Sequence, residues 1–138
     1  MSSFKIFDIA GSGMNAQNLR LNLVASNISN ANSVSSSIDE TYKSRQPVFA
    51  AQLQDAMNQQ NSATGVDVLG VVESDAPSVM EYSPNHPMAD KEGYIYKSNV
   101  NTVEEMANMM SASRSYQNNV EVLNTAKELM MQTLRMGQ

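Results

Sequence analysis

NTVEEMANMMSASRSYQNNVEVLNTAKELMMQTLRMGQ, residues 101–138, is the stretch that decides the fold. Read at alternating steps of three and four residues, it places an apolar or aromatic residue at seven of nine positions. This heptad spacing is typical of a helix that packs along its length against other helices. The nine positions are Met106, Met109, Ser113, Tyr116, Val120, Leu123, Lys127, Met130 and Leu134.

Both ends of this helix are marked in the sequence. Asn101 can cap the first turn, and Glu104 follows at the spacing of a capping box. Gly137 stands where a helix would stop. At about 1.5 Å per residue the helix would be roughly 50 Å long. A helix of that length in a chain of 138 residues needs a partner to pack on.

The other end of the chain supplies a second heptad repeat. Seven of its eight positions are apolar: Phe7, Ala10, Met14, Gln17, Leu21, Val24, Ile28 and Ala31. Gly11 and Gly13 lower the helix propensity by up to about 1 kcal/mol each, so this helix must gain its order from packing. The small residues from Ala10 to Gly13 would let another backbone approach closely. Two alternatives stay open: a helix surrounded by other helices, or one that lies on a core with its asparagines facing water.

The middle of the chain predicts short strands. Segment 42–53 contains Pro47, which favours an edge strand or an extended arm. Residues 65–74 and 79–82 alternate or cluster apolar residues as strands do, and 94–96 forms a third run. Three or four such strands would make a small antiparallel sheet or a partly closed barrel. Residues near 55–64 are rich in Gln and Asn and predict a mobile loop.

The sequence therefore predicts an α+β fold. We expect an N-terminal helix in residues 1–33 and a C-terminal helix in residues 101–138, which pair as a coiled coil. A small antiparallel β domain, residues 34–100, is inserted between them.

Composition excludes several classes of function. The net charge is −5 and no basic stripe is present, so nucleic acid is not an expected partner. The chain has no cysteine, which excludes disulfides and Cys-based metal sites. No apolar run reaches the ~18 residues of a membrane span, so we expect no membrane insertion. The first residues, MSSFKIFDIAGSG, lack the pattern of a Sec signal peptide.

Catalytic chemistry is not expected either. His86 is the only histidine, and it lies in a loop near Asp90 and Glu92. We interpret it as a loop residue next to solvated charges, because no second His or Cys completes a zinc set. Neither a nucleophile elbow nor a phosphate-binding glycine loop occurs. The methionines of the last helix, at helical spacing, indicate a packing face. We therefore predict no enzyme activity, no cofactor and no metal.

Three stretches together resemble the bacterial flagellar axial proteins, and among them the proximal-rod members. Within residues 6–33, SNISNAN (26–32) is similar to the signature S-N-[LI]-A-N-A-[ND] of that family. YSPNHPMADKEGYIYKSNVN (82–101) and EEMANMMSASRSYQNNVEVLNTAKELMMQTLRMGQ (104–138) are similar to its other two conserved segments. Ser29 and Ser98 depart from the pattern, which usually has Ala and Pro at these positions.

The resemblance implies a structural protein of the flagellar basal-body rod, the drive shaft that crosses the periplasm and transmits torque from motor to hook. Such proteins leave the cell through the flagellar type III export apparatus without a cleaved signal peptide. Their terminal helices tend to be disordered in the free subunit and to pack as coiled coils in the assembled axis. The implied partners are other rod proteins, the junction protein between the MS ring and the rod, and further copies of the chain in a helical rod. The alternative is a cytoplasmic helical adaptor or a protein resembling an export chaperone.

Subunit contacts are expected along both heptad seams and at the asparagine motif. A marginal helix becomes ordered when neighbours bury its apolar stripe. Asn27, Asn30 and Asn32 are expected to fix the turn after the first helix and its register. The predicted interface residues in the seams are Leu21, Val24, Ile28, Met109, Tyr116, Val120, Leu123, Met130 and Leu134.

Overall fold

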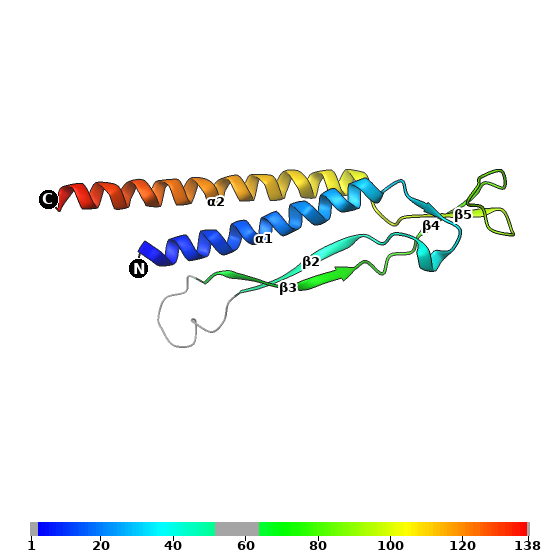
Figure 1. Cartoon of the computed structure of the whole chain (residues 1–138), viewed down its shortest axis with the longest axis horizontal. Helices are drawn as coiled ribbons and strands as arrows, with labels where there is room; N and C mark the ends of the chain where they lie inside the picture. Colours follow the sequence, from blue (N-terminus) through cyan, green and yellow to red (C-terminus); the bar gives the residue numbers. More distant parts are fainter. Residues whose placement is uncertain (1–2, 52–63, 138) are drawn as a thin grey trace.

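Two long helices and two small antiparallel sheets make up the computed structural model, which describes residues 3–51 and 64–137. Helix α1 (Ser3–Asn30) and helix α2 (Thr102–Met136) lie side by side and run in opposite directions (Figure 1). The elements between them are β, so the predicted α+β class with long terminal helices is confirmed. The loop predicted near 55–64 lies, apart from Thr64, outside the described residues.

The strands form two sheets instead of the single sheet or barrel expected from the sequence. Strands β2 (Arg45–Ala51) and β3 (Val66–Glu73) pair as a long hairpin. Strands β1 (Val34–Ser35), β5 (Tyr94–Lys97) and β4 (Val79–Tyr82) form a second sheet in that order. A short 3₁₀ helix, η1 (Ile38–Glu40), joins β1 to β2. The sequence pattern of a strand does not indicate which other strand it pairs with. The division of the strands into two sheets was therefore not predicted.

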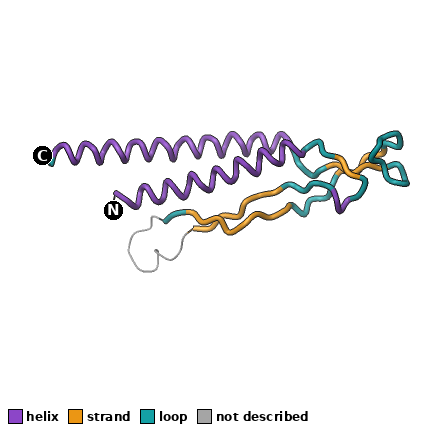
Figure 2. Tube along the Cα trace, in the orientation of Figure 1, coloured by secondary structure: helices purple, strands orange, loops and turns teal. Residues whose placement is uncertain are grey.

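The hairpin lies along α1, so α1 sits between α2 and the hairpin (Figure 2). The amide of Val66 donates a hydrogen bond to Ser12 Oγ at 3.1 Å, which ties the far end of the hairpin to α1. Pro47 is tolerated in β2 because this strand belongs to a sheet of only two strands. Within residues 5–30 of α1 the exposed residues recur at heptad spacing and are polar except for one alanine: Asp8, Asn15, Asn18, Asn22, Ala25 and Ser29.

Both ends of α2 follow the predicted signals. The side chain of Asn101 accepts hydrogen bonds from the amides of Val103 and Glu104, at 3.1 and 3.4 Å. The helix stops at Gly137, whose amide still donates to the carbonyl of Thr133. Side-chain capping satisfies amides that the first turn of a helix leaves free, so these contacts fix where α2 begins.

The buried core is small. Among the described residues, the buried hydrophobic side chains are three alanines together with Val24 and Ile95. Alanine lets two helices approach closely but buries little apolar area. The fold therefore depends on long shallow contacts between elements, and on polar contacts where the elements meet.

Candidate assembly interface

The face of α2 that packs on α1 follows a heptad repeat. Its residues are buried or half-buried at steps of three and four: Glu105, Met109, Ala112, Tyr116, Asn119, Leu123, Ala126 and Met130. Contacts with α1 lie on this face and directly beside it. Arg20 Nη2 donates a hydrogen bond to Asn108 Oδ1 at 3.1 Å. A Cβ added to Gly13 would lie 2.9 Å from Nδ2 of Asn119, so the missing side chain makes room for Asn119.

The predicted seam of α2 shares only part of this face. Met109, Tyr116, Val120, Leu123 and Met130 are half-buried. Leu134, by contrast, is 69% exposed, and Met106 is 55% exposed beside the buried Glu105. On α1, Val24 is buried and Leu21 and Ile28 are half-buried. A contact of these residues with a neighbouring subunit stays a prediction.

Asn27 holds the point where α1, β2 and the following loop meet. Its side chain is 0% exposed. Its Nδ2 donates to Ser44 Oγ (3.2 Å) and to the carbonyl of Arg45 (2.9 Å). Its Oδ1 accepts from Tyr42 Oη and from the amide of Arg45, both at 2.9 Å. Both the NH₂ group and the carbonyl oxygen of the Asn27 side chain thus fix the start of β2 against α1.

A second asparagine, Asn99, fixes the same junction from the other side. Its Oδ1 accepts from the amide of Ser44 at 2.7 Å, and its Nδ2 donates to the carbonyl of Ala76 at 2.8 Å. The neighbouring Ser98 donates through Oγ to the carbonyl of Ala31 at 2.8 Å. The hydroxyl of Ser98 therefore links the end of β5 to the turn after α1, a hydrogen bond that proline cannot make.

The other two motif asparagines occupy different environments. Asn30 Nδ2 donates to the carbonyl of Ser26 at 2.8 Å, and the carbonyl of Asn30 accepts from the amide and the hydroxyl of Ser33. These bonds shape the turn that follows α1. Asn32 is exposed on that turn. Asn99 and Ser44 were not predicted as site residues. Asn99 lies in segment 82–101, which resembles the family, whereas no sequence signal marked Ser44.

The turn before β5 is organised by Asp90. Its Oδ1 accepts hydrogen bonds from the amides of Tyr94 and Glu92 at 2.8 and 2.9 Å. These bonds, that of Tyr94 above all, lower the pKa of the Asp90 carboxyl. Gly93 has a φ of +86°, and an added Cβ would lie 2.9 Å from the Tyr82 ring, so only glycine fits here. His86 Nδ1 accepts from the amide of Met88 within the same loop.

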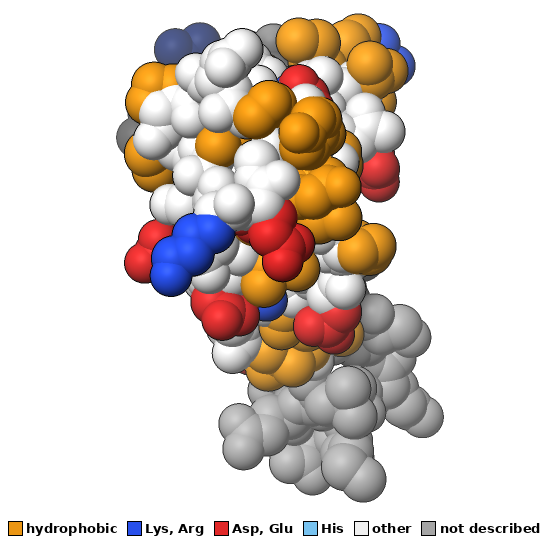
Figure 3. All heavy atoms as spheres, turned by 90° about the vertical axis from the view of Figure 1, so that its right-hand side faces the viewer, with side chains coloured by type: hydrophobic (Ala, Val, Ile, Leu, Met, Phe, Trp, Pro, Cys, Tyr) orange, Lys and Arg blue, Asp and Glu red, His pale blue; other side chains and the backbone are white. Residues whose placement is uncertain are grey.

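Much apolar surface stays uncovered in the single subunit. Seventeen large hydrophobic side chains of the described residues are exposed, against five buried hydrophobic ones. One group lies at the end of the molecule that carries β4, where apolar side chains gather on the surface (Figure 3). It consists of Val79, Met80, Tyr82 and Met88. A monomer rarely leaves this much apolar surface in water, so these faces are candidates for contacts with other proteins.

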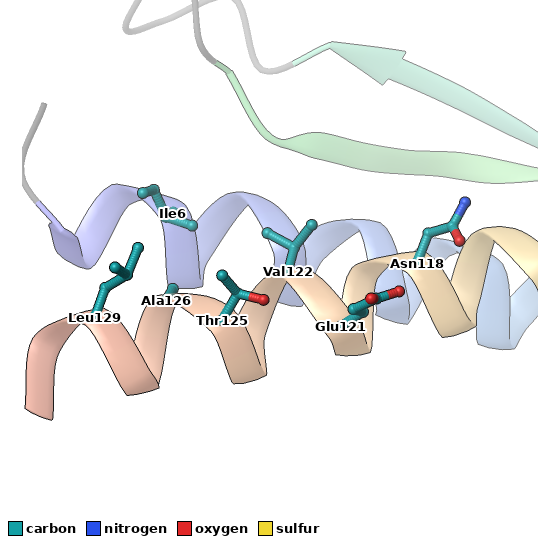
Figure 4. A pocket seen from close by; sticks show the side chains of 7 residues that line it. All are labelled: Ile6, Asn118, Glu121, Val122, Thr125, Ala126 and Leu129. Carbon is teal, nitrogen blue, oxygen red and sulfur yellow. The ribbon is translucent and has the colours of Figure 1, made fainter. Parts of the chain in front are cut away.

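A groove of about 500 Å³ lies between the start of α1 and the second half of α2. Ile6 comes from α1, and Val122, Ala126 and Leu129 come from α2 (Figure 4). Val122 and Leu129 are 48% and 59% exposed. Beyond this groove α2 extends past the end of α1 (Figure 1), and residues 131–137 are all exposed.

The part of the chain that the structure describes contains no helix apolar and long enough to cross a membrane.

Comparison with known proteins matches both helices. Residues 7–35 match the family described as flagella basal body rod protein, and residues 91–136 match the flagellar basal body rod FlgEFG protein C-terminal family. The chain is 49% identical to flagellar basal-body rod protein FlgC of Salmonella typhimurium and 48% identical to that of Escherichia coli O157:H7. It is 42% identical to FlgC of Buchnera aphidicola subsp. Acyrthosiphon pisum. Each match covers 100% of this chain and 100% of the relative.

Proposed function

The chain belongs to the family of flagellar basal-body rod protein FlgC, and we propose that it is a structural subunit of the rod that transmits torque for motility. The names of the relatives place such proteins in the basal body and describe structural components. They do not favour the alternative of a cytoplasmic adaptor or an export chaperone.

The main support for assembly through the helices is the contrast between a small buried core and a large exposed apolar surface. Burial of apolar surface drives association at roughly 25 cal/mol per Å², so uncovered faces on long helices favour packing between subunits. A face that meets a different face of the next copy generates a helical assembly rather than a closed dimer. We propose that α1 and α2 supply these contacts, with residues 1–33 and 101–138 as axial parts and 34–100 as the β-rich part.

The interlocked junction supports torque transmission. Asn27 and Asn99 connect α1, β2 and the segment before α2 through buried or half-buried hydrogen bonds. Such contacts resist rotation of the hairpin relative to the helices, because turning would leave polar groups unpaired. A subunit that keeps its parts fixed passes torque to its neighbours.

We propose a periplasmic rod as the location and the flagellar type III apparatus as the export route. The proposed neighbours are other rod proteins, further copies of this chain and the junction protein between the MS ring and the rod. The similarity to rod proteins of the basal body most directly supports contacts with other rod proteins.

Exposed apolar positions on α2 allow a direct test of the function. Val122→Asp and Leu129→Asp place a charge in the groove without opening a cavity in the subunit. We expect the purified variants to unfold at nearly the same denaturant concentration as the wild type. In a strain that lacks the natural protein, they should fail to restore rods and motility. Burying an unpaired charge at an interface costs several kcal/mol, which is the reason for the loss.

Gln117→Asp is the matched control, because Gln117 is exposed on the same helix and does not line the groove. It should restore motility. Wild-type protein absent from isolated basal bodies would refute the rod function. Full motility of both groove variants would refute the role of this face.

A further inference from the structure

A cleft of about 300 Å³ opens between α1, β2 and the first turns of α2. Its lining contains four charged side chains, whereas the lining of the groove near Leu129 contains one. Arg20 lines it from α1, Arg45 from β2, and Glu104 and Glu105 from α2. The three elements come together near the start of α2 (Figure 1), and each of them contributes residues to the lining of the cleft.

Glu105 is the unusual residue of this cleft. It is only 4% exposed, and its Oε2 has no hydrogen-bond partner within residues 3–51 and 64–137. A buried carboxylate oxygen without a donor costs free energy that the fold normally avoids. Phe49 and Val24 also line the cleft, so part of its wall is apolar.

Neither arginine of the cleft is bonded to Glu105, because each has another partner. Arg20 Nη2 donates to Asn108 Oδ1 at 3.1 Å. Arg45 pairs with Glu73, with 3.3 Å between Nη2 and Oε1. The lining holds two arginines and two glutamates, so its formal charges balance, and the carboxylate of Glu105 is the charged group that is buried without a donor. This carboxylate favours a cation over an anion.

We propose that Glu105 receives a cationic side chain, Arg or Lys, from a neighbouring subunit of the rod. This inference rests on the proposed function and names a polar contact that the apolar groove does not provide. A guanidinium or ammonium group entering the cleft gives Oε2 the donor that it lacks in the single subunit. A charge-assisted hydrogen bond of this kind fixes the register between subunits as well as adding affinity. Apolar faces can slide along one another, whereas a buried ion pair has one position.

Glu105→Gln tests the inference, because glutamine keeps the shape and removes the charge. In the purified subunit this variant should be at least as stable as the wild type, because Oε2 of Glu105 makes no hydrogen bond that the substitution could remove. In cells it should lower the number of complete rods by at least about tenfold, the range expected when one partner of a buried charge pair is truncated. Glu40→Gln is the control: it removes the same charge from an exposed residue of η1 that does not line the cleft, and should assemble normally.

A second measurement identifies the partner. Gln46 is exposed and lines the cleft, so a photo-crosslinking residue can replace it. In isolated basal bodies this residue should capture a peptide of a rod subunit. The captured peptide should contain Arg or Lys next to the linked position. Three results would overturn the inference: normal rods with Glu105→Gln, a captured peptide without a basic residue, or a loss of rods that matches a loss of subunit stability. Each leaves the rod function intact as long as wild-type protein is found in basal bodies.

Discussion

Replacing Gly11 with alanine should stabilise the isolated subunit. Gly11 lies inside α1, and a Cβ built on it meets no atom within 4 Å. The substitution therefore adds helix propensity without a clash, a gain of about 0.8–1.0 kcal/mol. For a domain of this size the melting temperature should rise by roughly 2–6 °C.

Thermal and urea unfolding of the purified subunit, followed by far-UV circular dichroism, measures the effect. Gly13→Ala is the matched control in the same helix. Its added Cβ would lie 2.9 Å from Nδ2 of Asn119, so Asn119 must shift and part of the gain is offset. We expect a smaller gain or a net loss for Gly13→Ala. Equal stability of wild type and Gly11→Ala would refute the reasoning, because it would mean that α1 is not helical in the free subunit.

The same variant tests whether the small residues of α1 serve a neighbour. The sequence predicts that the run from Ala10 to Gly13 allows another backbone to approach closely. Gly13 already makes room for Asn119 within the subunit, whereas the space above Gly11 is open. If a neighbouring helix uses that space, Gly11→Ala should reduce motility even though it stabilises the subunit. Unchanged motility would contradict this use of Gly11.

Two further predictions concern the polar contacts. Asn27→Ala should lower the free energy of unfolding by about 2–4 kcal/mol, because it leaves both backbone groups of Arg45 without their partner. Urea unfolding would show this, with Asn32→Ala as an exposed control, and a loss within error of that control would contradict the role of Asn27. Asp90 has a lowered pKa, so its contribution to stability is present above its ordinary pKa of about 3.9 and is lost as the pH falls through the lower folded value. Asp90→Asn should flatten the acid side of the stability profile measured by thermal unfolding, and an unchanged profile would refute the assignment.

The sequence predicts the helices well because their signals are local. Capping by Asn101 and termination at Gly137 depend on neighbouring residues, and both appear in the structure as expected. The identity of the packing face is harder to predict. A hydrophobic repeat selects Met106, which is exposed, over Glu105, which is buried. α2 has more apolar residues than one partner helix can cover. The sequence alone does not indicate which of its apolar stripes packs on α1.

The candidate site was predictable to a similar extent. The asparagine motif predicted contacts at the turn after α1. Asn30 bonds to Ser26 and Ser33 there, whereas Asn27 bonds to the start of β2. The roles of Asn99 and Ser98 could not be predicted, since their partners lie 23–67 residues away in the chain. Contacts at such distances depend on tertiary packing, which periodicity and turn signals do not contain.

Hydrogen exchange over residues 122–136, compared between the free subunit and isolated basal bodies, tests the central claim most directly. In the free subunit this end of α2 has few contacts, so its amides should exchange rapidly. In the basal body, neighbouring subunits should cover Val122, Leu129 and the residues beyond, and exchange should slow by orders of magnitude. Equal exchange in the two states would contradict the claim that α2 is an assembly element, and contacts would then have to lie on the β-rich part.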